Sequence, residues 1–174
     1  MLKYSYLFLL FILYSIGISY GIIVGKDSVI IDVPTNDNPL FDIESFLNLG
    51  YLQRVYEIAH NNLVVALQCL FFNIFTVGIY SVLHSLYNSF IIGLFLGEAL
   101  TKVTVLDLLL KFLSYGLTEL MGIWLLAYSG FLISIKFFFG RRFFSKKRIL
   151  YFILVGIFLI IESAFIENLC IQKW

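Results

Sequence analysis

The sequence predicts an all-α integral membrane protein, a bundle of five transmembrane helices with a cytoplasmic N-terminus and a C-terminus outside. Hydrophobic residues make up 61% of the 174 residues and charged residues only 13%, whereas a soluble domain has roughly 45–50% apolar and about 25% charged residues. Apolar stretches also recur at or near the roughly 20 residues that a helix needs to cross about 30 Å of hydrocarbon. The composition excludes a disordered chain, a nucleic-acid-binding module and a disulfide-stapled secreted domain, and the net charge of +1 gives no general attraction for anionic partners.

Five apolar stretches are the expected membrane helices. In chain order they are Tyr4–Val24, Leu63–Leu83, Tyr87–Leu100, Leu108–Ile135 and Ile149–Leu169. The third, at about 14 residues, is expected to borrow flanking residues or to cross only part of the bilayer. The first has Lys3 ahead of it, as a signal peptide does, but its apolar run exceeds the usual core of about 7–15 residues. An uncleaved anchor is therefore expected.

The basic residues predict the orientation of the chain. The hinge 136–148 contains six of them and no acid, namely Lys136, Arg141, Arg142, Lys146, Lys147 and Arg148. By the positive-inside rule this short connection lies in the cytoplasm, which places the acid-rich loop 25–60 outside. Five of these residues are also expected to contact a cytoplasmic partner or lipid, namely Arg141, Arg142, Lys146, Lys147 and Arg148. The alternative is that they form a binding patch for a nucleotide or for anionic lipids.

This orientation divides the chain into three parts. Residues 1–24 form a transmembrane anchor, residues 25–60 an extracytoplasmic loop, and residues 61–174 a four-helix membrane core that includes the hinge. The apolar residues of Phe41–His60 recur at near-helical spacing, which predicts an amphipathic helix on the outer leaflet. A helix that docks a partner is the alternative.

Polar side chains within apolar stretches are costly in hydrocarbon unless they meet protein groups. One stripe of small and hydrogen-bonding residues follows helical spacing: Asn62, Ala66, Cys69, Asn73, Thr76 and Tyr80. The stripe predicts helix–helix contact, and a substrate path lined by the same residues is the alternative.

Glu119 lies close to the middle of Leu108–Ile135, where an ionised carboxylate is expensive. A helical wheel points it into the bundle, protonated or hydrogen-bonded to a residue such as Asn73, with Leu120, Trp124 and Phe131 on the far side. The predicted intramembrane polar network comprises Asn62, Asn73, Tyr115, Glu119, Ser129, Glu162 and Glu167. Two interpretations stay open: a network that fixes helix register, and a proton or cation relay.

Glycines predict close helix packing. Gly93 and Gly97 form a GxxxG pattern, and Gly116, Gly122 and Gly130 supply further small positions in the next helix.

Catalytic and metal-binding motifs are missing from the sequence. It contains no P-loop, HExxH, zinc-type cysteine pair or GxSxG elbow. His60 and His84 stand at opposite ends of the predicted second helix, about 36 Å apart, so no shared metal is expected. Ser129 with His84 imitates a serine dyad but has no oxyanion hole. The expectation is a non-enzymatic protein without metal or cofactor.

Five short motifs follow one another between His60 and Leu169. They are His60-Asn61-Asn62, Asn88-Ser89, the glycine-rich run Ile91–Gly97, Tyr115-Gly116-Leu117-Thr118-Glu119-Leu120 and Ala164-Phe165-Ile166-Glu167. Their order and spacing resemble the stage II sporulation protein M family of bacterial membrane proteins. In the family pattern the fourth motif reads His-Gly-x-x-Glu-Leu, so Tyr115 replaces the usual histidine while Glu119 is retained.

The resemblance implies a non-enzymatic, multi-pass subunit of the bacterial cell membrane. Some family members are partners of ABC-type ATPases in bacteriocin export, maturation or immunity; others help to assemble cell-wall hydrolases during sporulation engulfment. The expected partners are therefore other membrane subunits with an ABC-type ATPase or cell-wall hydrolases, and the lipid bilayer. A homo-oligomer is left open. The abundance of Phe, Ile and Tyr, with Lys favoured over Arg, suits a low-GC Gram-positive source.

Overall fold

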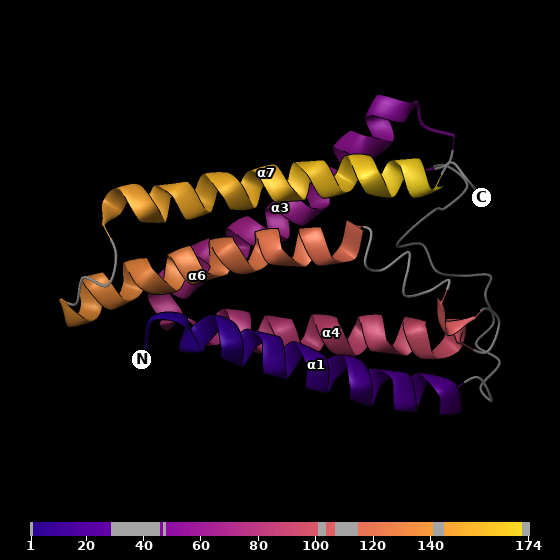
Figure 1. Ribbon diagram of the computed structural model, residues 1–174, viewed down its shortest axis with the longest axis horizontal. Coiled ribbons are helices and arrows are strands. Elements are labelled where there is room, and N and C mark those ends of the chain that lie inside the picture. The colour runs from indigo at the N-terminus through magenta and orange to yellow at the C-terminus, as the bar shows by residue number, and fades with distance from the viewer. Residues whose placement is uncertain are drawn as a thin grey trace.

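The computed structural model describes residues 2–28, 46, 48–100, 104–106, 115–140 and 145–171, with the side chains of 2–4, 27, 28 and 171 left out. Its five long helices are α1 (Leu2–Ser28), α3 (Tyr51–Thr76), α4 (Ile79–Ala99), α6 (Leu117–Phe139) and α7 (Lys146–Ile171). Each is long and apolar enough to cross a membrane, and the two chain ends lie at opposite ends of the bundle (Figure 1). The prediction of an all-helical protein with five spans is confirmed, and its sidedness stays a prediction.

The chain reverses direction at Val77–Gly78, earlier than the sequence predicted. Val77 has φ 52° and Gly78 φ 89°, a left-handed pair that ends α3 as glycine commonly does. The prediction that the second helix runs to Leu83 is therefore wrong. The third is not short, since α4 has 21 residues. No Asp, Glu, Lys or Arg lies between Glu57 and Glu98 to mark the break.

Two further boundaries differ from expectation. Helix α6 begins at Leu117, which puts Glu119 in its first turn rather than near its middle; residues 108–114 lie outside the described residues. Helix α3 begins at Tyr51, so the end of the predicted amphipathic segment Phe41–His60 continues directly into a membrane span. Most of 41–50 lies outside the described residues.

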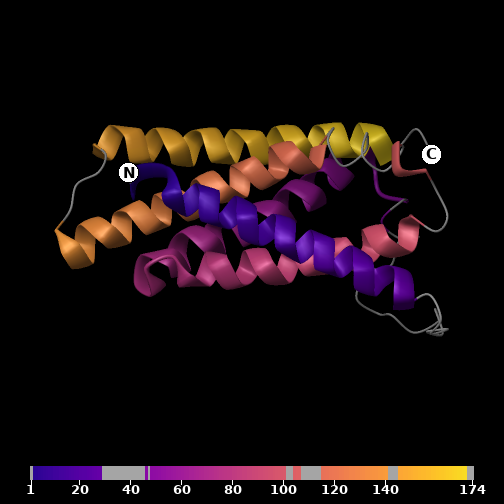
Figure 2. The ribbon, with the colours of Figure 1, turned by 60° about the horizontal axis from the view of Figure 1, so that its bottom comes forward.

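The helices form two groups. Helix α1 runs alongside α4, whereas α6 lies between α3 and α7 and touches α1 at few positions (Figures 1 and 2). Helix α6 is the most buried of the five. The face of α6 that carries Trp124 and Phe131, predicted to lie opposite Glu119, packs against α1. Trp124 packs edge-on against Tyr14, and Phe131 stacks on Tyr6.

Small residues allow α1 and α4 to approach closely. A β-carbon on Gly21 would lie 2.8 Å from the Cα of Gly93, and one on Gly97 would lie 3.0 Å from the Cα of Gly25. Close backbone approach of this kind is how glycine favours helix association in membranes. The predicted packing residues Gly93 and Gly97 thus have matching glycines in α1, which the sequence reasoning did not single out.

The predicted glycines of α6 face other neighbours. A β-carbon on Gly122 would lie 2.8 Å from the carbonyl oxygen of Gly156 in α7, and one on Gly130 would meet the backbone of Leu70 in α3. Gly116 immediately precedes α6. Gly122 and Gly130 therefore allow α6 to pack closely against α7 and α3, respectively.

Candidate functional site

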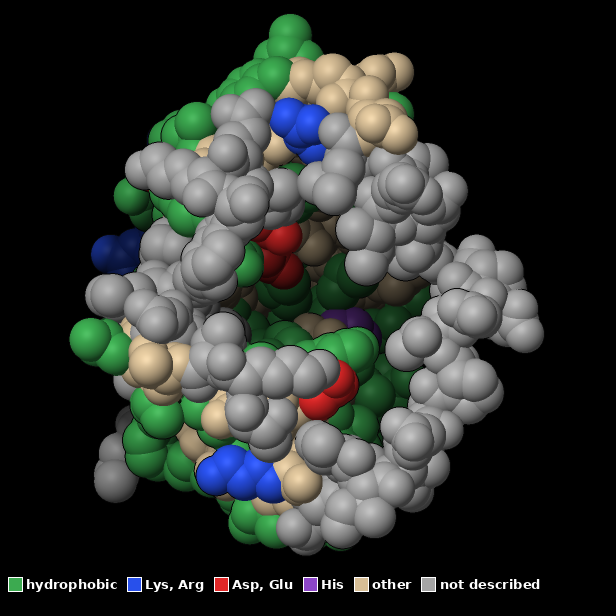
Figure 3. Space-filling model, turned by 90° about the vertical axis from the view of Figure 1, so that its right-hand side faces the viewer, with side chains coloured by type: hydrophobic (Ala, Val, Ile, Leu, Met, Phe, Trp, Pro, Cys, Tyr) green, Lys and Arg blue, Asp and Glu red, His purple; other side chains and the backbone are tan. Residues whose placement is uncertain are grey.

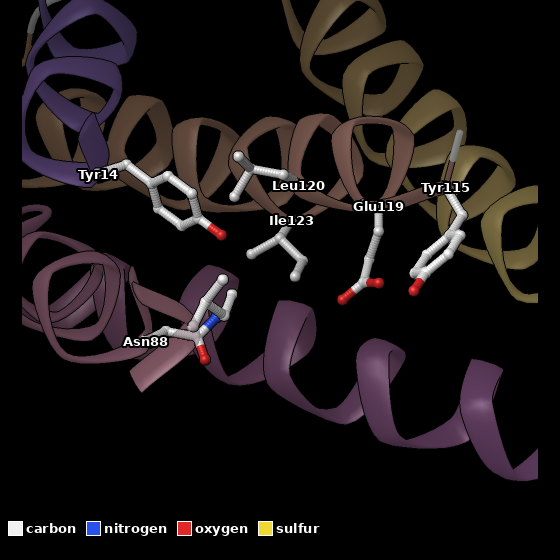
Figure 4. A pocket seen from close by; sticks show the side chains of 8 residues that line it. Tyr14, Asn88, Tyr115, Glu119, Leu120 and Ile123 are labelled. Carbon is white, nitrogen blue, oxygen red and sulfur yellow. The ribbon is translucent and has the colours of Figure 1, made fainter. Parts of the chain in front are cut away.

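A cavity of about 220 Å³ lies between α1, α4 and the beginning of α6. Its lining residues are Tyr14, Asn88, Ile92, Tyr115, Gly116, Glu119, Leu120 and Ile123. Figure 4 shows the carboxylate of Glu119 and the hydroxyls of Tyr14 and Tyr115 directed into this space, with the amide of Asn88 across from them. A mostly apolar cavity with a few convergent polar groups is typical of a small-ligand site.

The cavity lies toward the end of the bundle where the C-terminus is found. Seen from that end, the described atoms enclose a hollow with largely hydrophobic walls and acidic side chains at its edge (Figure 3). Leu120 and Ile123, from one face of α6, supply part of the apolar wall. The expectation that Leu120 lies opposite Glu119 is wrong, because both side chains line the same cavity.

Glu119 forms no hydrogen bond or ion pair with any side chain that the structure describes, and it is partly buried. Glu167, near the end of α7, is close enough to interact with it electrostatically. Glu119 and Glu167, two of the three acids in the predicted network, therefore repel one another across the α6–α7 contact. Neither receives a compensating positive charge from the described residues.

Tyr115 immediately precedes the membrane-spanning part of α6. Burial, then the negative charge of Glu167, raises the pKa of its hydroxyl above the usual value. The hydroxyl therefore keeps its proton near neutral pH and can donate a hydrogen bond at the beginning of α6.

Asn73 forms its hydrogen bonds with residues other than Glu119, so the alternative of a hydrogen bond between these two residues is not found. Its side chain is fully buried beside the α3–α4 turn. The amide nitrogen Nδ2 lies 2.7 Å from Ser81 Oγ, 2.9 Å from the Ala127 carbonyl and 3.1 Å from the Tyr6 hydroxyl. These contacts join α1, α3, α4 and α6.

Tyr6 and Ser81 complete this buried cluster. The Tyr6 hydroxyl donates to the carbonyl of Gly78 at 2.8 Å, and the backbone N–H of Ser81 donates to Asn73 Oδ1 at 3.0 Å. We call Tyr6, Asn73, Gly78, Ser81 and Ala127 the polar hub. It joins the two helix groups at the end of the bundle opposite the mouth of the cavity.

The other predicted network residues are dispersed. Ser129 is buried, and its hydroxyl donates to the Leu125 carbonyl one turn earlier in α6, at 2.8 Å. Asn62 is partly buried on α3. Glu162 is exposed on the outer surface of α7, because it lies about 100° around the helix from the buried Ser163. A single continuous network is therefore not formed.

A second polar contact was missed by sequence reasoning. Arg54 Nε donates to Asn168 Oδ1 at 2.9 Å, and Asn168 Nδ2 donates to the Tyr51 carbonyl at 3.2 Å. Asn168 is fully buried, and the contact fixes the beginning of α3 to the end of α7. Its only signal in the sequence is an asparagine in an apolar stretch.

Charges separate between the two ends of the bundle. The described acidic side chains all lie in the half that contains the mouth of the cavity, and they are Glu57, Glu98, Glu119, Glu162 and Glu167. Lys26, in the last turn of α1, and Arg54, near the beginning of α3, lie at this end as well, so acids outnumber bases there. Lys146, Lys147 and Arg148 are exposed at the opposite end, where α7 begins. Arg141 and Arg142 lie outside the described residues.

The histidines occupy different helices, His60 on α3 and His84 on α4, so the separation expected for a shared helix does not apply. In the part of the chain that the structure describes, no group of three His, Cys, Asp or Glu side chains is placed to hold a metal ion. His84 stacks on Tyr80.

The comparison with protein families agrees with the motif order. The family model described as stage II sporulation protein M matches residues 8–169, which include α3, α4 and α6, most of α1 and α7, and every described residue lining the cavity. Searches among curated proteins and among solved structures returned no match. This multi-pass membrane protein belongs to the stage II sporulation protein M family.

Proposed function

We propose that this protein is a non-enzymatic, permease-like subunit that works with an ABC-type ATPase in peptide export, maturation or immunity, with bacteriocins as the peptide class. The observation that carries the proposal is the cavity itself. Glu119 faces it without a compensating charge among the described residues, and its walls come from both helix groups.

The helix arrangement supports movement around this cavity. The α1–α4 pair is tightly packed within itself and touches α6 at few positions, while the polar hub holds the two groups together at one end. Rigid groups joined at a localised contact can change their relative angle with little internal rearrangement. Such a motion widens or narrows the cavity at its mouth.

The basic end of the bundle supports the expected site of the ATPase. Lys146, Lys147 and Arg148 are exposed there, beside the end that carries the N-terminus. The positive-inside rule assigns this end to the cytoplasm, which is where an ATPase binds. The cavity then opens outward.

The test is copurification of the tagged protein from native membranes, followed by mass spectrometry and an export or immunity assay. We expect an ABC-type ATPase in the eluate, and we expect Glu119→Gln to reduce export or protection while the complex stays intact. Glu162→Gln, an exposed carboxylate on α7, is the matched control and should change neither. Recovery of a cell-wall hydrolase instead, with a silent Glu119→Gln, overturns the proposal in favour of an assembly scaffold.

A further inference from the structure

We infer that the cavity binds a primary ammonium group carried on an apolar body about the size of a lysine side chain. The inference deepens the proposed function by naming the class of ligand for the same cavity. It rests on the charge, the lining and the volume of that cavity.

The charge follows from Glu119. A carboxylate in a membrane-spanning segment is expensive unless it meets a counter-charge or hydrogen-bond donors, and the described residues give Glu119 neither. Its carboxylate faces the open space of the cavity (Figure 4). An ammonium group in that space supplies both the counter-charge and charge-assisted hydrogen bonds.

The remaining polar groups favour the same ligand. The hydroxyl oxygens of Tyr14 and Tyr115 and the amide oxygen of Asn88 can accept the other ammonium protons, and tyrosine rings attract cations. No Lys or Arg is among the lining residues that the structure describes, which disfavours an anion. A hard divalent cation needs about six oxygen ligands, usually including several carboxylates. Glu119 is the only carboxylate among the described lining residues, which disfavours such a cation.

The walls and the volume define the rest of the ligand. Ile92, Leu120 and Ile123 bury an aliphatic or aromatic body. A dry apolar cavity of about 150 Å³ accommodates benzene, so the cavity of about 220 Å³ here has room for a hexyl or benzyl group together with the ammonium.

Trp124 provides the signal for a binding test. Its ring lies 5.7 Å from that of Tyr14, which lines the cavity. In a Trp174→Phe background Trp124 is the sole tryptophan. The full-length protein in a nonionic detergent is titrated with hexylammonium, with hexanol as the neutral probe of similar size and hexanoate as the anion.

We expect hexylammonium to change Trp124 fluorescence saturably, and hexanol to bind about tenfold more weakly, the equivalent of about 1.4 kcal/mol. Glu119→Gln should remove this preference, and the control Glu162→Gln should retain it. Tyr14→Phe, which keeps the ring and removes one acceptor, should weaken hexylammonium binding by a few-fold even if Glu119→Gln proves poorly folded. Equal binding of hexanol and hexylammonium to the unmutated site, or no saturable change, overturns the inference.

Competition identifies the natural source of the ammonium. Nanodiscs containing phosphatidylethanolamine, compared with phosphatidylglycerol alone, test a lipid headgroup; an amphipathic lysine peptide, compared with its norleucine analogue, tests a peptide. Competition by either supports the ammonium site. The titration contains no ATPase, so the two proposals can fail separately. If hexylammonium does not bind but the ATPase copurifies, the inferred ligand is wrong and the proposed subunit role stands. If hexylammonium binds but no ATPase copurifies, only the proposed role is wrong.

Discussion

The side-chain amide of Asn73 in α3 lies 3.1 Å from the hydroxyl of Tyr6 in α1, although the two residues are 67 positions apart. This contact, buried in the polar hub, is one of the few polar links between the two helix groups.

Replacing Asn73 with Ala should destabilise the bundle by about 2–3 kcal/mol, because Tyr6, Ser81 and the Ala127 carbonyl lose a shared partner in a buried site. Thermal unfolding in detergent measures the effect. Asn62→Ala, at a partly buried position on the same helix, is the control and should cost less than about 1 kcal/mol. Equal losses from both variants would contradict a special role for the hub.

The coupling between Tyr6 and Asn73 can be measured separately. Tyr6→Phe keeps the ring stacking on Phe131 and removes the hydroxyl, so a double-mutant cycle with Asn73→Ala isolates the pair. We expect a coupling energy of about 0.6–1.7 kcal/mol, the usual range for hydrogen bonds between membrane helices. Additive losses would show that the two residues act independently.

The glycine contact between α1 and α4 predicts strong sensitivity to side-chain size. Gly21→Leu should destabilise the protein by at least about 2 kcal/mol, because the added atoms collide with the backbone of Phe90, Gly93 and Leu94. Ser19→Leu, at an exposed position of α1, is the matched control and should be nearly neutral. Thermal unfolding distinguishes them, and tolerance of Gly21→Leu would refute the close approach.

Cysteine labelling tests the orientation. In a background in which Cys69 and Cys170 are replaced by alanine, an impermeant maleimide should label Gln53→Cys on whole cells and Lys147→Cys only after permeabilisation. Both positions are exposed, at opposite ends of the bundle. The reverse pattern would invert the proposed topology and put the mouth of the cavity in the cytoplasm.

Tyr115 should make stability depend on pH in the alkaline range. Burial and the negative charge of Glu167 raise the pKa of its hydroxyl in the folded protein, so its contribution to stability is fully present below the unfolded pKa of about 10 and is lost as pH rises through the higher folded pKa. Thermal unfolding between pH 8 and pH 11 should therefore show a steeper loss of stability for the unmutated protein than for Tyr115→Phe, which has no ionisable hydroxyl. Identical pH profiles for the two proteins would contradict the buried position of this hydroxyl.

Hydropathy alone predicted five membrane helices, because burial of apolar surface in lipid depends on composition and length. It did not locate the reversal at Val77–Gly78, where the apolar stretch continues without a charge and only the backbone turns. Gly93 and Gly97 were identifiable as packing positions. Their pairing with Gly21 and Gly25 depends on which helices become neighbours, a tertiary property that spacing within one helix does not contain.

The candidate site, like the fold, could be predicted from the sequence only in part. Glu119 stood out because a carboxylate in an apolar stretch is costly, but its depth and partners depended on where α6 begins. Asn73, which the sequence offered as one hydrogen-bond partner for Glu119, bonds instead within the polar hub. Asn88, which lines the cavity, was noted only as part of a family motif, and Tyr14 carries no sequence signal that distinguishes it from other residues of its helix.

The separation of charge between the two ends gives the protein an electrical asymmetry across the bilayer. With the basic end in the cytoplasm, a membrane potential that is negative inside favours this orientation, by about 2.3 kcal/mol for each charge moved through 100 mV. A cation that enters from the acidic end toward Glu119 travels part of the way down the same potential. Occupancy of the cavity should therefore rise in energised cells and fall when the potential is collapsed.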